Sequence, residues 1–298
     1  MTGRFTAAAD LEGALTALAD GFRPVAGGTD LVVGSRQGKW RLPDDLVAID
    51  RVEGLSGIME TANGLRIGAT TNHASLVEDP RIRERWTALV DAAAIVGSPA
   101  TRNTGTLGGN LANASPAAET SGPLLCFDAT VEIHSARGSR ILPVADLFAG
   151  PGRTVLAPDE LIVAVELPEL GGAGSCYVRL EFRRQMEIAV VGATAVVALD
   201  GGLVRDARIA ITALAPTVRR ATAAEAALIG TDGGRAAADG AALLAADAAE
   251  PISDVRASLE YRRAMAAVVV RRAILGAVAR ARGEVLDIPA SATTWGFA

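Results

Sequence analysis

Residues that bind metals are scarce in this sequence. Its 298 residues include two cysteines, Cys126 and Cys176, and two histidines, His73 and His134. Two cysteines cannot build a disulfide framework, nor supply the four thiolates of an iron–sulfur cluster or a structural zinc site. With so few histidines, a catalytic metal held by protein side chains is also disfavoured. We therefore predict no metal site on this chain and interpret both cysteines as small buried hydrophobes.

The sequence also lacks a basic surplus, a long apolar run and a secretion signal. Its formal net charge of −5 disfavours nucleic-acid binding, which depends on a basic surface. The apolar run at residues 264–270 is stopped by Arg271 and Arg272, far short of the ~20 residues that cross a bilayer. The first ten residues do not have the basic and then apolar layout of a signal peptide. We expect a cytoplasmic protein that binds neither nucleic acid nor membrane.

Length and composition favour an ordered protein of two domains. Half of the residues are hydrophobic, and domains of about 100 to 200 residues are the common size. The segment 169–174, which holds three glycines, is the best candidate for a linker. We place one domain at residues 1–170 and the other at 175–285.

The second domain has a clear order of elements. Three long strand candidates at 176–182, 188–199 and 205–214 precede helix candidates at 218–229, 235–246 and 257–282. Strands followed by helices predict an α+β domain in which helices cover one face of an antiparallel sheet.

The first domain mixes shorter elements. Apolar spacing predicts helices at 6–19, 79–96 and 123–127, and strands at 23–25, 46–50, 65–69, 130–135 and 161–168. Asp10 is a candidate cap for the first helix. Residues 146–156 are expected to form a loop.

Two glycine-rich clusters stand out in this aliphatic sequence. Residues 101–120 concentrate glycines with short hydroxyl and amide side chains, and residues 26–31 repeat that chemistry. Glycines allow sharp turns and close approach of a ligand to the backbone. Exposed backbone N–H groups in such loops form a concave site for anions. We expect the two loops to close on one diphosphate from opposite sides.

Common nucleotide and hydrolase motifs are absent. The segment from Gly34 to Lys39 is one residue too short for a Walker loop and continues into Trp40, and neither glycine cluster is a G-x-G-x-x-G motif that opens a helix. No G-x-S-x-G nucleophile elbow occurs. A single glycine cluster is usually only a turn. Two such clusters, together with the further motifs described next, favour a ligand site.

Several motifs resemble one family. AGGTD at 26–30, TLGGN at 106–110 and NASPAAET at 113–120 are similar to the FAD-binding subunit of molybdenum hydroxylases, which includes carbon monoxide dehydrogenase medium subunits and xanthine dehydrogenase flavin domains. The segment GPGRTVLAPDELI at 150–162, and Arg183-Arg184 followed by Glu187-Ile188-Ala189, extend the resemblance to nearly the whole chain. It implies an α+β fold: a two-lobed FAD-binding domain of the vanillyl-alcohol oxidase (PCMH) type, then a small C-terminal α+β domain.

The resemblance implies a set of FAD-binding residues. In that family the two glycine loops hold the FAD diphosphate, which gives this role to Ala26, Gly27, Gly28, Thr29, Asp30, Leu31, Thr106, Leu107, Gly108, Gly109 and Asn110. It also implies cofactor contacts for Thr71, His73, Arg102, Asn103, Ser115 and Ala118. A histidine in the position of His73 is more often a hydrogen-bonding residue in a loop or at a helix start than a catalyst.

Four further positions are implied at the two ends of the cofactor. Glu119 stands where the family usually has Asp, a carboxylate expected to accept hydrogen bonds from the adenosine ribose. Arg179 stands where many members have Lys near the flavin pyrimidine edge, where a cation would stabilise negative charge on the reduced flavin. Ile162 and Ile188 match positions beside the isoalloxazine ring.

The implied function is electron relay. A molybdopterin large subunit would oxidise a substrate, an iron–sulfur small subunit would pass electrons on singly, and FAD on this chain would deliver them to NAD, oxygen or another acceptor. The implied assembly is a heterotrimer, alone or dimerised, and no catalytic side chain is implied on this chain. One alternative is a self-sufficient FAD-dependent oxidoreductase that acts directly on a small molecule. Another is a non-redox scaffold that has lost its cofactor, which the intact glycines disfavour.

Overall fold

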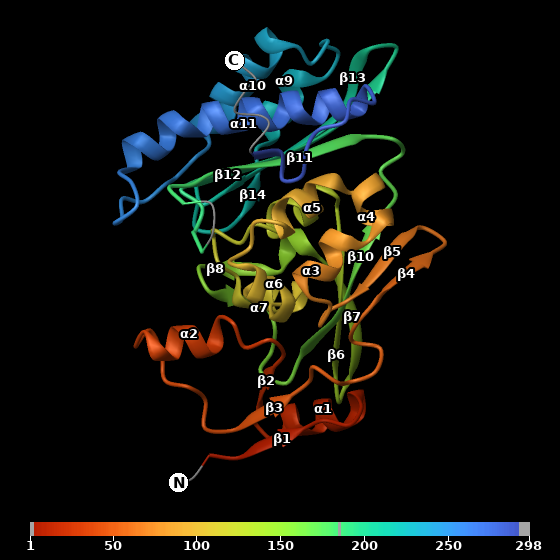
Figure 1. The fold of residues 1–298 in the computed structure, drawn as a ribbon, viewed down its shortest axis with the longest axis vertical. Helices are drawn as coiled ribbons and strands as arrows, with labels where there is room; N and C mark the ends of the chain where they lie inside the picture. Colours follow the sequence, from red (N-terminus) through yellow and green to blue (C-terminus); the bar gives the residue numbers. More distant parts are fainter. Residues whose placement is uncertain (1–2, 184–185, 292–298) are drawn as a thin grey trace. The chain divides into compact units, whose positions relative to one another are not determined.

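The computed structural model describes residues 3–183 and 186–291, which form two compact units. Unit 1 consists of the chain up to Ser75, Pro99–Ala114 and Asp128–Pro168. Unit 2 consists of Leu76–Ser98, Ser115–Phe127 and the chain from Glu169 onward. The two units therefore alternate along the sequence, which can be followed by residue number on the colour bar of Figure 1. The division at residues 170–175 stays a prediction.

Unit 1 begins with a small parallel sheet. Its strands β1 (Phe5–Ala7), β2 (Arg23–Val25) and β3 (Leu46–Ala48) lie in the order β1-β3-β2. Helix α1 (Leu11–Ala19) is capped by Asp10, whose carboxylate accepts a hydrogen bond from Gly13 N at 2.8 Å. The helix predicted at 6–19 therefore begins only at Leu11, because residues 5–7 are used as strand β1.

A five-stranded sheet forms the rest of the framework of unit 1. Its order is β4-β5-β10-β6-β7, with all pairs antiparallel, from β4 (Ile58–Thr61), β5 (Gly64–Gly68), β10 (Leu161–Pro168), β6 (Thr130–Ser135) and β7 (Gly138–Pro143). The central strand β10 is buried on both faces over most of its length, which explains its continuous apolar sequence. Between β7 and β10 lie η1 (Val144–Asp146), β8 (Phe148–Gly150) and β9 (Arg153–Thr154), where only a loop was expected.

The glycine-rich segment of unit 1 is largely helical. It contains α6 (Pro99–Thr104) and α7 (Leu107–Asn113), and α2 (Leu31–Arg36) follows the first glycine cluster. Helix α7 packs against β10 and begins at Thr106, whose side chain accepts a hydrogen bond from Gly109 N at 3.1 Å. This capping, together with the contact on β10, overrides the low helix propensity of Gly108 and Gly109. Helix α3 (His73–Glu78) runs from the last residues of one unit 1 segment into unit 2.

Unit 2 is built on an antiparallel sheet of order β11-β12-β13-β14. Its strands are β11 (Gly174–Leu180), β12 (Val191–Asp200), β13 (Leu203–Thr212) and β14 (Arg219–Arg220), followed by α9 (Thr222–Leu228), α10 (Arg235–Asp247) and α11 (Leu259–Ala281). Helix α11 packs over one face, α9 packs on β13, and α10 packs on both of these helices; their apolar side chains and those of the sheet form the core of this unit (Figure 1). The predicted antiparallel sheet with helices on one face is confirmed.

The other face of this sheet is covered by helices from earlier in the sequence. These are α5 (Thr87–Ala93), which packs on β11, and α8 (Ser121–Cys126), which packs on β12 and β13. The single helix predicted at 79–96 is two helices, α4 (Pro80–Arg85) and α5, because the backbone leaves the helical region at the fully buried Trp86.

A buried ion pair joins α5 to the end of α11. Arg280 donates hydrogen bonds of 2.6 and 3.1 Å to the carboxylate of Asp91, which also accepts from the backbone of Tyr177 and Ala290. The long helix α11 carries arginines throughout, and no helix in the described residues is long and apolar enough to span a membrane.

Candidate functional site

The two glycine clusters lie side by side within unit 1. A Cβ added to Gly27 would overlap the carbonyl oxygen of Thr104, so these two stretches of backbone are in direct contact. The hydroxyl oxygen of Thr29 lies 3.2 Å from where a Cβ on Gly105 would stand. The structure therefore brings the two loops together, as the sequence predicts; their role in binding stays a prediction.

The first loop presents a row of unpaired backbone N–H groups. Among the described residues, none accepts a hydrogen bond from the N–H of Gly27, Gly28, Thr29, Asp30 or Leu31. Gly28 has a φ of +65°, a conformation that other residues rarely adopt. Successive amides in such a turn converge on an anion. Residues 27–31 therefore have the donor chemistry that a diphosphate requires.

The amides of the second loop are used within the protein. Leu107 N donates to Thr71 O at 3.0 Å and Gly108 N to Ala69 O at 2.8 Å, while Gly109 and Asn110 donate to Thr106. The backbone N–H groups of residues 107–110 are therefore already used in the fold, and the contact predicted between this loop and the diphosphate stays a prediction. Their glycines serve close packing instead, since a Cβ on Gly108 would lie 2.6 Å from that of Ala69. Sequence alone does not reveal which amides already have a partner.

Thr71 and His73 adjoin this second loop. The Thr71 hydroxyl exchanges hydrogen bonds with the backbone of Gly57, at 3.0 and 3.1 Å, which fixes the turn after β5. His73 donates its backbone N–H to Gly105 O, and its ring is buried with Nδ1 unpartnered among the described residues. Burial, and then the positive charge of Arg102, lower the pKa of His73 to about 4. The imidazole is therefore neutral at pH 7 and has one polar atom without a partner.

The remaining predicted residues of unit 1 lie on several different elements. Arg102 and Asn103 lie on α6, where the Asn103 carbonyl accepts a hydrogen bond from Asn72 Nδ2 at 3.1 Å. Burial lowers the pKa of Arg102. Ile162 lies on β10 opposite Ile133 and is only 4% exposed. Ala26 comes directly after β2, at the start of the first loop.

The other predicted residues belong to unit 2. Ser115, Ala118 and Glu119 precede α8; the Ser115 hydroxyl accepts from Ala117 N, and Ala118 N donates to Ser115 O at 3.0 Å. Ile188 is 43% exposed and follows Glu187, whose carboxylate accepts from Arg183 Nε. Arg183 is thus an ion-pair partner, whereas Arg184 lies outside the described residues.

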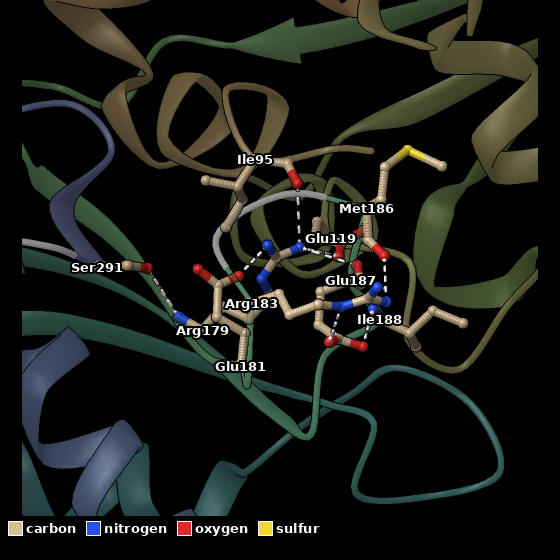
Figure 2. A network of polar contacts seen from close by, with 9 residues as sticks. All are labelled: Ile95, Glu119, Arg179, Glu181, Arg183, Met186, Glu187, Ile188 and Ser291. Carbon is tan, nitrogen blue, oxygen red and sulfur yellow. Dashed lines mark hydrogen bonds and ion pairs between the residues drawn. The ribbon is translucent and has the colours of Figure 1, made fainter. Parts of the chain in front are cut away.

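Arg179 is the centre of a buried polar network in unit 2 (Figure 2). Its Nη1 donates to Glu119 Oε1 at 2.7 Å and to Ile95 O at 3.1 Å, while Nη2 pairs with Glu181. Burial alone would lower the pKa of Arg179, but the neighbouring carboxylates outweigh it and raise that pKa. Burial raises the pKa of Glu119, and the guanidinium opposes that rise. The arginine is therefore a fixed cation with two carboxylates around it.

This pairing constrains the roles implied for Glu119 and Arg179. The adenosine ribose and the flavin pyrimidine edge are opposite ends of FAD, yet these two side chains are in contact. Both assignments stay predictions. Because Glu119 and Arg179 are in contact, they can bind only the same part of the cofactor. The second carboxylate, Glu181, was not predicted. Residues two apart lie on the same side of an extended chain, so the spacing of residues 179 and 181 could have indicated that Glu181 lies beside Arg179.

Comparison with known proteins assigns the family. Residues 2–170 match the profile of the FAD binding domain in molybdopterin dehydrogenase, and residues 177–277 match the CO dehydrogenase flavoprotein C-terminal domain. This chain belongs to the FAD-binding subunits of the molybdenum hydroxylase family. As a member it is an FAD-dependent oxidoreductase subunit of mixed helix and sheet structure, with an FAD-binding domain and a flavoprotein C-terminal domain.

Individual members of the family are similar along nearly the whole chain. The xanthine dehydrogenase FAD-binding subunit of Escherichia coli O157:H7 is 32% identical over 93% of this chain and 97% of its own length. The carbon monoxide dehydrogenase medium chain of Afipia carboxidovorans is 32% identical over 92% and 95%. Among solved structures, CO dehydrogenase from Oligotropha carboxidovorans superposes with a TM-score of 0.89 at 30% identity, covering 94% of this chain and 99% of the other.

The site in unit 1 fits the cofactor of this family. A Cβ at Gly27 would fill the contact between the two loops, and the unpaired amides of residues 27–31 suit an anionic diphosphate. The protein presents these donors without lysines, in keeping with its net negative charge.

Proposed function

We propose that this chain is the electron-delivering subunit of a molybdenum hydroxylase. It would receive electrons from iron–sulfur clusters on a small subunit, next to a molybdopterin large subunit in a heterotrimer, and pass them to NAD, oxygen or another acceptor. The observation that carries the proposal is the row of five unpaired amides at residues 27–31 beside Thr104 and Gly105. The relatives that are named as medium chains or subunits of complexes support the partner assignment.

The proposed roles of individual residues follow from their surroundings. The amides of residues 27–31 would hold the diphosphate, and residues 106–110 would shape the wall of the site through close backbone packing. The neutral ring of His73 would offer one further hydrogen bond, in a location already made positive by Arg102. FAD, when bound, supplies the redox chemistry by accepting and releasing electrons.

The wider proposal includes the domain division and the cellular setting. Residues 1–170 would carry FAD and residues 175–285 would form the second domain, in agreement with the spans of the two matching profiles. The two cysteines of this chain are too few for a cluster, so the iron–sulfur centres would belong to another chain. We propose a cytoplasmic location.

The test is to purify the tagged chain from its native host and analyse what accompanies it. We expect a yellow protein that releases FAD, with iron, molybdenum and two further polypeptides in the same fraction. The substitution Gly27→Ala should remove FAD, whereas Gly240→Ala on the exposed side of α10 should retain it. A chain that purifies without iron or molybdenum, yet oxidises or reduces a small molecule alone, would show the self-sufficient enzyme instead. A colourless chain that takes up no FAD would contradict both.

A further inference from the structure

Among the buried polar atoms of unit 2 that have no hydrogen-bond partner in the described part of the chain, five lie on or next to one face of its sheet. They are Ser121 Oγ, Tyr177 OH, Arg179 Nε, Thr194 Oγ1 and Thr212 Oγ1. Four of them belong to one face of the β11-β12-β13 sheet, and Ser121 begins α8, the helix that packs on β12 and β13 over this face. The opposite face of the same sheet is aliphatic. All four buried hydroxyls that have no partner in the described part of the chain therefore lie in the layer between the sheet and α8.

Strand register brings these side chains together. Arg179 pairs with Gly192, and Gly192 pairs with Thr212, so the three form one row across the sheet. Tyr177 and Thr194 pair in the next row on the same face, two residues along each strand. The row that contains Arg179 and Thr212 thus has a glycine, and no side chain, at its centre.

Two glycines mark the place where the hydroxyls meet. A Cβ on Gly122 of α8 would lie 2.7 Å from Thr194 Oγ1 and 3.1 Å from Thr212 Oγ1. A Cβ on Gly192 would lie 2.7 Å from Tyr177 OH and 3.1 Å from Thr212 Cβ. The hydroxyls of Thr194 and Thr212 therefore meet at Gly122, the hydroxyl of Tyr177 lies at Gly192, and Thr212 adjoins both glycines.

Hydroxyls in this position require a partner. Each can donate one hydrogen bond and accept two, and a buried hydroxyl that makes none is destabilising. Valine or phenylalanine would fill the same volumes without that penalty. Protein interiors meet such a need with ordered water, which typically makes about three hydrogen bonds to buried polar groups.

We propose that unit 2 contains an internal water site between the sheet and α8, formed by the hydroxyls of Tyr177, Thr194 and Thr212. Ser121 and Arg179 Nε complete its surroundings. The two Nη atoms of Arg179 already bind Glu119, Glu181 and the Ile95 carbonyl. A water on Nε therefore satisfies the remaining donor and fixes the plane of the guanidinium. This inference does not depend on the proposed function.

The first test is a crystal structure of the FAD-containing protein at a resolution that shows ordered water. We expect density for at least one water within hydrogen-bond distance of two or more of the three hydroxyls. Hydroxyls that bond directly to one another, with no density between them, would overturn the proposal.

The second test uses the sign of the stability change. Thr194→Val and Tyr177→Phe each remove one hydroxyl with little change of shape. If the hydroxyl holds a water, its loss leaves that water short of a partner and the Tm falls; if the site is dry, loss of an unpaired polar group raises the Tm. We expect both variants to have a lower Tm. Thr70→Val removes a hydroxyl that donates a 2.8 Å hydrogen bond directly to Leu55 O. It is the control that shows how far the Tm falls when a hydroxyl with a known partner is lost. A higher or unchanged Tm in both variants would overturn the proposal.

Discussion

The guanidinium of Arg179 lies 2.7 Å from the carboxylate of Glu119, although 60 positions separate them in sequence. Glu119 precedes α8 and Arg179 is the penultimate residue of β11, so the contact exists because α8 packs against the unit 2 sheet. The Arg179 side chain is completely buried, and that of Glu119 is nearly so. Removing either partner therefore leaves a charge in an environment that solvates it poorly.

Glu119→Ala should lower both stability and FAD affinity. We expect the free energy of unfolding of the FAD-free chain to fall by about 3 kcal/mol, since Arg179 loses one of its two carboxylates. FAD titration should show weaker but measurable binding. Glu250→Ala, at an exposed pair with Arg219, is the matched control and should change stability by less than about 1 kcal/mol. An unchanged FAD affinity in Glu119→Ala would remove this residue from the cofactor site.

Gly27→Ala should disrupt the contact between the two glycine loops. The added Cβ would overlap the Thr104 carbonyl oxygen, so one loop must move. We expect loss of bound FAD, measured as the ratio of visible to ultraviolet absorbance after purification. Gly240→Ala has open space for its Cβ and should raise the free energy of unfolding by about 0.5 to 1 kcal/mol. FAD content equal in both variants would argue against a diphosphate site at this contact.

Gly109→Asp tests the second loop by charge. Gly109 is exposed in α7, and its added Cβ would lie 2.8 Å from Thr106 Oγ1. We expect the carboxylate to repel the diphosphate and abolish FAD retention. Gly109→Ala is the control for size alone and should keep more cofactor than the Asp variant. Normal FAD content in Gly109→Asp would exclude residues 106–110 from the neighbourhood of the diphosphate.

His73 should make the FAD-free chain less stable in acid. In the unfolded chain this histidine takes up a proton near its ordinary pKa of about 6.5, whereas in the folded chain its pKa is about 4. Over that window the unfolded state binds more protons, so stability falls as the pH is lowered. We expect this fall to be about 3 kcal/mol larger in the wild type than in His73→Gln, measured by urea unfolding at several pH values. Parallel pH profiles would show that folding does not lower the pKa of His73.

The sequence predicted best where a single physical pattern dominates. Strand β12 is a long apolar run that ends at a turn, β13 is apolar along its second half, and the aliphatic spacing of α10 and α11 fits a helix on only one side of a sheet. The motifs around Gly27 and Gly108 were specific enough to indicate FAD, because several of them recur along the chain with matching order.

The sequence predicted less where contacts between distant segments determine the local structure. Helix α7 contains two adjacent glycines and was not expected, since its stability comes from Thr106 and from packing on β10. The break at Trp86 is invisible in the apolar spacing because Trp86 is buried whether or not the helix continues. The pairing of Glu119 with Arg179 depends on how α8 docks on a sheet formed much later in the chain. No local pattern carries that information.

The dependence of α5 and α8 on strands that come much later in the chain has a consequence for biosynthesis. Both helices leave the ribosome long before β11, β12 and β13, the strands that cover them. The nascent polypeptide must therefore expose two apolar helical segments until these strands are synthesised, a state that chaperones recognise. A premature stop codon ahead of β13 should accordingly yield aggregated or proteolysed product rather than a smaller flavoprotein.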